Sequence, residues 1–351
     1  MASKLRVALT RELLNPDGNP PDHIRNMPLR THPRVDFQAL PSVEKIMTGS
    51  TAAGFDACLT GSVLWTAESY KGIGGLCCIS RWGVGYDNLN PAECTANDVV
   101  LITTRGALDY PVAESALSYM LALSHRMLLK DRLARANDWT QRLNTLGNEL
   151  REKTIGIVGM GAIGSALLKL LAPFHPGRLV CFDPYLKPER ARELGVEPVD
   201  LNTLCRESDI ITIHTPKIPE TTNLIRAEHF KLMKPTAYLV NTARGGIVNQ
   251  RDLYEALRDR RIQGAGIDVF EKEPPDADEP LLTLDNVILS PHANSLTQEC
   301  FRDIGLHITT NILKLIDGVA PEFAVNREVL ERPGFKKKLA GIKERLLGGG
   351  S

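Results

Sequence analysis

The chain has 351 residues, of which 43% are hydrophobic and 24% are charged, so it is long enough for about two domains with proper cores. Lys plus Arg and Asp plus Glu both total 42, which leaves no net basic field to attract nucleic acid or an anionic membrane. The composition therefore argues against nucleic-acid-binding and membrane-surface proteins and favours small molecules as partners.

Seven cysteines are scattered along the chain without a CxxC pair, at Cys58, Cys77, Cys78, Cys94, Cys181, Cys205 and Cys300. Most lie among apolar neighbours, which indicates reduced, buried thiols of a cytoplasmic protein rather than a metal site. No apolar stretch approaches the roughly 20 residues that span a bilayer. Residues 1–9 do not have the pattern of a signal peptide, so we expect a protein that stays in the cytoplasm.

Short apolar runs alternate with amphipathic segments along most of the chain, as is typical of parallel sheets covered by helices. In the first part, strands are predicted at residues 6–9, 35–40, 57–59, 75–80 and 99–103. Helices or turns are predicted at 49–55 and 91–97, and the Pro-rich stretch 15–33 is expected to form an irregular surface loop.

Pro111 opens a long predicted helix that crosses between domains, because apolar residues recur at helical spacing from 112 to 128. Beyond it, strands are predicted at 154–158, 179–182, 210–214, 237–241, 264–269 and 287–289, giving a six-stranded doubly wound sheet. A last helix at 297–316 returns the chain to the first domain. The basic run 336–343 is expected to be a solvated helix face, and 348–351 a flexible linker.

A glycine-rich turn follows the strand at 154–158. Gly159 permits the tight turn, Gly161 lets a pyrophosphate approach the backbone N–H groups of the next helix, and Gly164 lets that helix pack on the strand. Asp183 ends the following strand, where a carboxylate binds ribose hydroxyls and repels a 2′-phosphate. These residues predict NAD rather than NADP. The structural alternatives are a turn that binds nothing and an aspartate that only caps a turn.

Three further polar residues each follow a predicted strand of this second part. Arg244 lies on a glycine-flanked loop, where its planar guanidinium can bind a carboxylate through two hydrogen bonds. Glu273 lies on a loop stiffened by prolines, and a carboxylate near His292 would favour the imidazolium form of that histidine. This combination predicts a general acid and base beside a dinucleotide. A structural salt bridge of Arg244 and a solvated Glu273 are the alternatives, and His214 is expected to orient the loop over the cofactor.

On these residues the chain resembles the D-isomer specific 2-hydroxyacid dehydrogenase family, from about residue 5 to residue 330. The most specific stretches are 81–88, 158–164, 214–216 with 221–222, 241–248, 266–270 with 273–274, and 291–292. The resemblance implies a Rossmann-type NAD-binding domain (110–295) inserted into a discontinuous flavodoxin-like substrate-binding domain (1–109 and 296–335), followed by a tail (336–351). It also implies a homodimer that forms through the NAD-binding domain.

The resemblance further implies roles for individual residues. Arg244, Glu273 and His292 become the catalytic set, and the backbone at Val84 and Gly85 grips the substrate carboxylate. The expected contacts to NAD are Gly159, Gly161, Ala162, Ile163, Gly164, Asp183, Thr215, Thr242 and Asp268. The implied reaction moves a hydride between NAD(H) and a D-2-hydroxy acid, with His292 exchanging the proton and Glu273 stabilising its imidazolium.

Two departures from the family pattern concern the substrate. Trp82 stands where many relatives have a small residue, and Leu108 and Tyr110 replace a stretch that is polar in some of them. They favour an apolar or bulky 2-oxo acid over a phosphorylated one, while Arg81 keeps an anionic substrate open and Trp82 is as readily explained by packing. Two rival functions stay open. One is a formate or phosphite dehydrogenase of the same fold, although Glu273 argues against a formate dehydrogenase. The other is an NAD(H)-sensing, corepressor-like binding protein.

Overall fold

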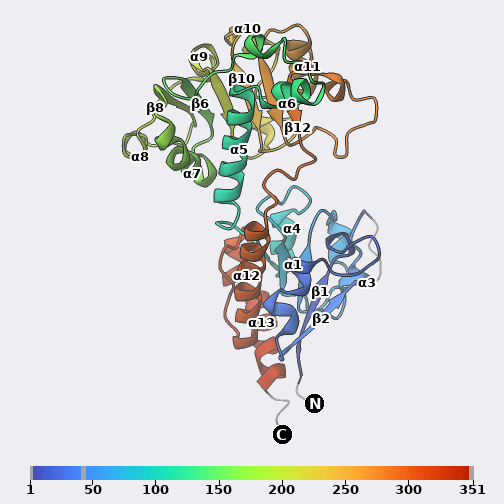
Figure 1. Ribbon diagram of the computed structural model, residues 1–351. Helices are drawn as coiled ribbons and strands as arrows, with labels where there is room; N and C mark the ends of the chain where they lie inside the picture. The colour runs from blue at the N-terminus through green and yellow to red at the C-terminus, as the bar shows by residue number, and fades with distance from the viewer. Residues whose placement is uncertain (1–2, 41–44, 348–351) are drawn as a thin grey trace. The chain divides into compact units, whose positions relative to one another are not determined.

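The computed structural model describes residues 3–40 and 45–347 and divides the chain into two compact units. Unit 1 contains Met1–Leu108 and Thr297–Ser351, and unit 2 contains Asp109–Leu296. Unit 1 is thus built from both ends of the chain: in Figure 1 its strands are blue to cyan, while its helices α12 (Gln298–Lys314) and α13 (Pro333–Leu347) are red.

Unit 1 has a parallel five-stranded sheet in the order β2-β1-β3-β4-β5, the order of flavodoxin-like sheets. The strands are β1 Leu5–Leu9, β2 Val35–Ala39, β3 Ala57–Thr60, β4 Cys78–Arg81 and β5 Val100–Ile102. Besides α12 and α13, its described helices are α1 Asp22–Arg25, α2 Pro28–Thr31, α3 Gly49–Ala52 and α4 Pro91–Ala96. Short 3-10 turns lie at Arg11–Leu13, Ala67–Tyr70, Leu315–Asp317 and Arg327–Glu331.

The first strand shows why these apolar runs form a buried sheet. Leu5, Val7 and Leu9 point into one core of unit 1, and Ala8 points into the core on the other face. Because both faces are covered, the strand is apolar except at the exposed Arg6.

The loop predicted at 15–33 is only partly irregular. It contains α1 and α2, whose residues Ile24 and Leu29 are fully buried and belong to the core of unit 1. The prediction was wrong because each helix is a single turn, too short for a helical period, and Pro28 begins the second one at a position that suits proline.

The segment after residue 335, set apart in the sequence as a tail, continues α13. Phe335, Leu339, Ile342 and Leu346 from this helix are buried in the same core as β1, so the segment is an integral part of unit 1. The prediction of a solvated face was wrong because these four apolar residues recur at helical spacing between the lysines and form a buried stripe. The predicted linker at 348–351 lies outside the described residues.

Unit 2 contains a parallel sheet of seven strands in the order β12-β11-β10-β9-β6-β7-β8. The strands are β6 Thr154–Val158, β7 Arg178–Phe182, β8 Glu197–Pro198, β9 Ile210–Ile213, β10 Tyr238–Asn241, β11 Gly264–Ile267 and β12 Val287–Leu289. Its described helices are α5 Asp109–Ser124, α6 Met127–Arg135, α7 Ala162–Leu171, α8 Pro188–Leu194, α9 Leu201–Glu207, α10 Ala227–Leu232 and α11 Gln250–Arg258. Its 3-10 turns lie at Arg142–Thr145, Ala172–Phe174, Pro219–Thr221 and Pro280–Thr283.

The doubly wound α/β fold is confirmed, with one strand more than predicted. The additional strand β8 is a two-residue edge strand that pairs only with β7. Its Pro198 lacks an N–H group, which an edge position tolerates and an interior strand does not. Apolar cores lie on both faces of the sheet, and α5 and α7 belong to one of them (Figure 1).

The long helix predicted from Pro111 is two helices. It starts at Asp109 and breaks at Arg126, which has a left-handed backbone with φ 53° and separates α5 from α6. Met127 and Leu128, taken as buried positions of one continuous helix, are 54% and 47% exposed after this break.

All seven cysteines are buried free thiols, as the sequence predicted. Burial raises their pKa values, for example to about 11 at Cys94, so these thiols stay protonated and unreactive at neutral pH. Among the described residues, no helix has the combination of length and apolar character needed to cross a membrane.

Candidate active site

The glycine turn of unit 2 has the geometry that a dinucleotide requires. Gly159 has φ 92°, and a Cβ there would lie 2.8 Å from the carbonyl oxygen of His214. A Cβ at Gly164 would lie 2.5 Å from the carbonyl oxygen of Gly159, so helix α7 packs closely on the turn. At Gly161, by contrast, a Cβ would meet nothing within 4 Å. The turn is therefore closed toward the protein and open at the one glycine where a phosphate would approach.

Helix α7 begins at Ala162, directly after Gly161, and no side chain caps it. The first N–H groups of a helix lack partners within the helix, and the helix dipole adds partial positive charge there. Ala162 and Ile163 thus present backbone donors beside the open glycine, an arrangement that suits a pyrophosphate.

Asp183 follows β7 beside the same turn. Its Oδ2 accepts the Met160 N–H at 2.8 Å, and its Oδ1 accepts the Tyr185 N–H at 2.8 Å. The carboxylate therefore caps a turn, as the structural alternative for Asp183 predicted. The same two hydrogen bonds fix its position next to the glycines. Each oxygen keeps a further lone pair that can accept a hydrogen bond from a ribose hydroxyl.

Glu273 and His292, which are nineteen positions apart in the sequence, meet in a direct contact. His292 Nδ1 lies 2.8 Å from Glu273 Oε2, and Glu273 Oε1 accepts the Phe270 N–H at 3.0 Å. Burial raises the pKa of Glu273, but the bonds from His292 and Phe270 outweigh it, and the net pKa is lowered. The carboxylate is therefore ionised at neutral pH and positioned to stabilise a charged imidazole.

The loop that carries His292 is held by Asp268, which is only 3% exposed. Asp268 Oδ1 accepts the N–H groups of Ala293 and Asn294 at 3.0 and 3.1 Å, and its carbonyl accepts the His292 N–H at 2.8 Å. The Asn294 side chain also donates to Ser115 Oγ on α5 at 2.6 Å. These bonds support a left-handed backbone at His292, with φ 54°. Sequence reasoning missed Asn294, although it lies only two positions after His292.

Arg244 lies just past β10. Its Nη1 donates to the Ala243 carbonyl at 2.7 Å, and its charge contributes to lowering the Glu273 pKa. The loop around it is tightly packed, since a Cβ at Gly245 would overlap the Phe270 carbonyl oxygen at 1.7 Å. Arg244 and the His292–Glu273 pair thus belong to one electrostatic group.

At the carboxyl edge of the sheet, two buried polar atoms have no hydrogen-bond partner among residues 3–40 and 45–347: Thr242 Oγ1 and His214 Nδ1. Thr242 is 8% exposed and His214 is 9% exposed. Thr215, which was also expected near NAD, follows His214 in the sequence and is half-buried. Buried polar atoms nearly always have partners in complete structures, so these two atoms fit a site that a bound group completes.

The predicted substrate-binding residues Arg81, Trp82, Val84, Gly85 and Leu108 lie in unit 1, whereas Tyr110 lies on α5 of unit 2 and is 57% exposed. Val84 and Gly85 are half-buried on the loop after β4, and Arg81 ends that strand with its Nη1 donating to the Trp82 carbonyl. Trp82 is 8% exposed and packs in the core of unit 1, and Leu108 packs against the same core. Trp82 also lies in an aromatic cluster, 5.4 Å from the His23 ring and 6.1 Å from the Phe301 ring. Packing is thus one role of Trp82.

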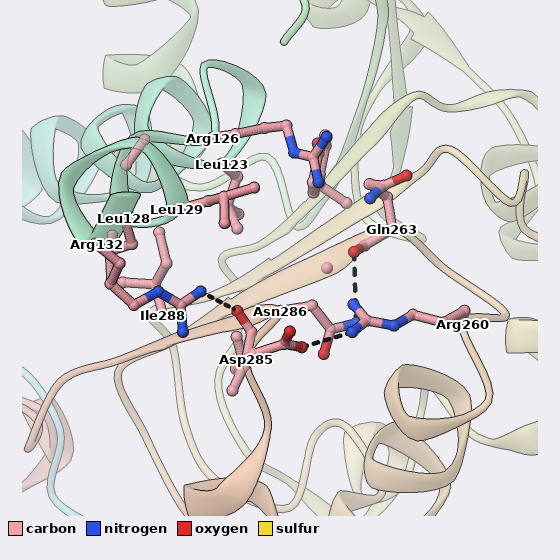
Figure 2. Close-up of a pocket in the computed structure, with 14 residues that line it drawn as sticks. Leu123, Arg126, Leu128, Leu129, Arg132, Arg260, Gln263, Asp285, Asn286 and Ile288 are labelled. Atoms are coloured by element: carbon pink, nitrogen blue, oxygen red, sulfur yellow. Dashed lines mark hydrogen bonds and ion pairs between the residues drawn. The ribbon is translucent and has the colours of Figure 1, made fainter. Parts of the chain in front are cut away.

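A cavity of about 350 Å³ lies at the other edge of the unit 2 sheet, where strands β10, β11 and β12 begin. Figure 2 shows Arg132 and Arg260 both reaching Asp285: Arg260 donates to the carboxylate at 2.6 Å and Arg132 to the backbone carbonyl at 3.1 Å. This cavity is not the predicted cofactor site, because the glycine turn lies where β6 ends.

Residues 117–294, inside unit 2, match the family model described as D-isomer specific 2-hydroxyacid dehydrogenase, NAD binding domain. A glyoxylate reductase of Korarchaeum cryptofilum is 37% identical over 275 residues, which are 77% of this chain and 82% of that protein. The chain belongs to the D-isomer specific 2-hydroxyacid dehydrogenase family. Its NAD-binding domain spans residues 117–294, which include the glycine turn, Arg244, Glu273 and His292.

Two further proteins are similar to this chain over most of its length. A D-3-phosphoglycerate dehydrogenase of Archaeoglobus fulgidus is 37% identical over 77% of this chain, and the chain spans only about half (51%) of that protein's length. The structure of D-lactate dehydrogenase from Escherichia coli is 26% identical with a TM-score of 0.76, covering 91% of this chain and 99% of the other. The family fold thus extends over both units of this 2-hydroxyacid dehydrogenase family member.

Proposed function

We propose that this chain is an NAD-dependent D-2-hydroxyacid dehydrogenase, which transfers a hydride between NAD(H) and a 2-hydroxy acid or its 2-oxo acid. The observation that carries the proposal is the 2.8 Å contact of His292 Nδ1 with Glu273 Oε2 within an NAD-binding domain. An imidazole oriented by a carboxylate is the general acid and base that this reaction needs.

The contact supports a distinct role for each residue of the pair. Glu273 anchors Nδ1, so Nε2 of His292 is the atom that exchanges a proton with the substrate. In oxidation, Nε2 takes the proton of the substrate hydroxyl, and the ionised Glu273 stabilises the imidazolium that forms. In reduction, Nε2 returns this proton to the C2 oxygen. Glu273 is a positioning and stabilising group, and His292 is the group that touches the reacting atoms.

Arg244 completes the proposed catalytic set. Its guanidinium binds the substrate carboxylate and polarises the C2 oxygen, which orients C2 and stabilises the negative charge that develops on the oxygen. The Ala243 carbonyl holds one nitrogen of the guanidinium at 2.7 Å and so limits its rotation.

The residues of unit 2 fit NAD, which supplies the hydride acceptor when it is bound. The backbone at Gly159, Gly161, Ala162, Ile163 and Gly164 would receive the pyrophosphate at the start of α7. Asp183 would bind the adenosine ribose, and its negative charge favours NAD over NADP. Thr215, Thr242 and Asp268 would contact the nicotinamide half. The support comes from the open space at Gly161 and the two unpartnered buried atoms beyond the turn.

For the substrate, we propose that the backbone at Val84 and Gly85 binds the carboxylate. Apolar Trp82 and Leu108 on the same unit favour an apolar or bulky 2-oxo acid, whereas Arg81 would suit a second negative charge. Glyoxylate and 3-phosphoglycerate, named in the relatives, are the small and the charged ends of the range to test.

The decisive experiment measures NADH oxidation with pyruvate, glyoxylate, hydroxypyruvate, phenylpyruvate and branched 2-oxo acids, and NAD reduction with 3-phosphoglycerate, formate and phosphite. We expect turnover with at least one 2-oxo acid, fastest for an apolar side chain. Turnover with formate or phosphite alone would assign the rival chemistry. Tight NADH binding with negligible rates on every compound would identify a nucleotide sensor.

We also propose a homodimer that forms through unit 2. Between α6 and β6, large apolar side chains are exposed by 66% at Trp139, 72% at Leu143 and 76% at Leu146. Exposed apolar side chains gathered on one short segment mark a protein–protein contact. The test is the mass in solution by light scattering: we expect twice 38.6 kDa for the wild type and a shift toward the monomer for Leu143→Glu with Leu146→Glu.

A cytoplasmic location is a further proposal, supported by seven buried free thiols without a disulfide. Cell fractionation tests it. Recovery of the protein from a membrane or extracellular fraction would contradict it.

A further inference from the structure

His214 and Thr242 are neighbours at the carboxyl edge of the unit 2 sheet. Strands β9 and β10 pair in parallel with Ile213 beside Asn241, and each of the two residues comes directly after that pair. The His214 N–H donates to the Val158 carbonyl at 2.7 Å, and its own carbonyl lies against Gly159 of the dinucleotide turn. Both unpartnered buried atoms, His214 Nδ1 and Thr242 Oγ1, thus belong to residues beside the nucleotide site.

Counting hydrogen bonds decides which nitrogen of His214 carries the proton. Its Nε2 lies 2.9 Å from Thr212 Oγ1, and Thr212 is fully buried. If Nε2 donated this bond, the Thr212 hydroxyl proton and the lone pair on Nδ1 would both lack a partner. If the Thr212 hydroxyl donates to Nε2, the proton sits on Nδ1, and a single N–H group is left without an acceptor. The second arrangement leaves fewer buried groups unsatisfied and is favoured.

The charge of the ring agrees with this arrangement. Burial lowers the pKa of His214 to about 4, so the imidazole is neutral at physiological pH. A neutral imidazole with its proton on Nδ1 is a donor on one side and an acceptor on the other. It does not supply protons to a reaction at pH 7.

We propose that His214 is a cofactor-binding residue, which donates a hydrogen bond from Nδ1 to an acceptor oxygen of the bound dinucleotide, while the Thr242 hydroxyl bonds the same ligand. Thr212 is the positioning residue that holds the proton on Nδ1. The inference deepens the proposed function, because it rests on NAD(H) being the ligand of unit 2. Its subject is binding, so it does not depend on turnover.

A matched pair of variants tests the donor through the Kd of NADH, measured by fluorescence titration. The side-chain nitrogen of asparagine occupies a place like that of histidine Nδ1, whereas that of glutamine occupies a place like that of Nε2. His214→Asn therefore keeps the donor, and we expect a Kd within about threefold of the wild type. His214→Gln loses it, and we expect a Kd about tenfold higher. Equal Kd values for His214→Gln and the wild type would overturn the inference.

Thr212 provides a second pair that leaves His214 in place. Thr212→Ser keeps the hydroxyl and is expected to bind NADH like the wild type. Thr212→Val keeps the shape but removes the group that fixes the tautomer, and its Kd should rise about fivefold. If both variants bind like the wild type, the tautomer assignment is wrong. This pair remains decisive if a His214 variant does not fold.

The ring nitrogens can also be observed directly by NMR of protein labelled with ¹⁵N at histidine. We expect a protonated Nδ1 on His214 and a change in its shift when NADH binds. An unprotonated Nδ1, or no change on binding, would overturn the inference. A buried water joining His214 to Thr242 would instead give unchanged NADH binding with lower thermal stability in His214→Gln. If the wild type itself does not bind NADH, both the proposed function and this inference are wrong.

Discussion

The two edges of the unit 2 sheet both carry charged residues, but they differ in how those charges are held. At the edge where the strands end, Glu273 and Asp183 are bound by backbone N–H groups, and two buried polar atoms lack any partner. At the edge where the strands begin, Arg260 pairs with Asp285, and both side chains are more than half exposed. Two buried atoms at this second edge, Ser208 Oγ and Asn286 Oδ1, also lack a partner among the described residues, while the Asn286 side-chain nitrogen is held by the Leu257 and Gln263 carbonyls. The hollow of about 350 Å³ lies at this second edge.

The difference shows that the volume of a cavity is a poor guide to the chemistry of this unit. Water can solvate an exposed ion pair, so such a pair implies no ligand. Unpartnered buried atoms occur at both edges, but only at the first edge do they lie on the same side of the sheet as the glycine turn, Asp183 and the His292–Glu273 pair. Such an atom is costly, and a ligand that supplies the missing hydrogen bond would recover the cost. We therefore expect changes at the first edge to alter binding and catalysis, and changes at the second to alter neither.

The largest expected effect is that of His292→Ala. Loss of general acid–base catalysis should lower kcat by roughly 10²- to 10⁴-fold, while NADH binding stays near that of the wild type. The matched control is His125→Ala, which removes an exposed histidine next to Arg126 at the opposite edge. Steady-state kinetics with the best 2-oxo acid measure both. An active, folded His292→Ala enzyme would refute the assignment of the proton donor.

The proximity of Glu273 and His292 could be anticipated from the sequence. Each residue follows a predicted parallel strand, and the carboxyl ends of such strands share one edge of the sheet. Most strands were recognisable because burial on both faces makes them largely apolar, whereas β2 alternates polar and apolar residues and is partly exposed.

Other features of the structure could not be predicted, because the sequence carries no clear pattern for them. Strand β8 is a Glu-Pro pair with no periodicity, and the left-handed Arg126 that divides the long helix is neither glycine nor asparagine. The unpartnered atom of His214 needs coordinates, although Thr212 and His214, alternate residues of an otherwise apolar run, could have drawn attention to that face of the strand.

Glu273→Gln should have the next largest effect. A hydrogen bond to a charged group contributes about 1.5–3 kcal/mol, so kcat/KM should fall roughly 10- to 100-fold. The pKa of Glu273 is lowered, against the effect of burial, by the bonds from His292 and Phe270. In the folded wild type, the Glu273 carboxylate should therefore stay ionised at the ordinary carboxyl pKa and above it. The stability that its bonds provide should be lost as the pH falls below that range.

In Glu273→Gln, the free energy of unfolding should not show this decrease at acid pH. Urea unfolding at several pH values can measure the difference. Glu271→Gln on the same loop is the control, and its kinetics should stay close to those of the wild type. A Glu273→Gln enzyme with unchanged kcat/KM would mean that the contact with His292 does not serve catalysis.

Asp183→Ala tests the cofactor preference. Without the carboxylate, the ratio of NADP to NAD binding constants should move toward unity by about tenfold, since about 1–2 kcal/mol of hydrogen bonding and repulsion is lost. Asp200→Ala is the control, because Asp200 also caps backbone, accepting the Thr203 N–H at 2.9 Å at the start of α9. It should lower stability without changing the preference. If both variants keep the preference of the wild type, Asp183 only caps its turn.

The smallest effect is expected at the opposite edge, from Asp285→Asn. The Arg260–Asp285 pair is 2.6 Å long, but its side chains are 56% and 60% exposed, and exposed pairs contribute between 0 and about 1 kcal/mol. The backbone carbonyl that receives Arg132 is unchanged by this substitution. We therefore expect kcat and the Kd of NADH to stay within about twofold of the wild type, with a slightly lower melting temperature. A tenfold loss of activity in a variant of unchanged mass would show that the edge with the cavity is coupled to the edge with the chemistry, and the distinction between them would fail.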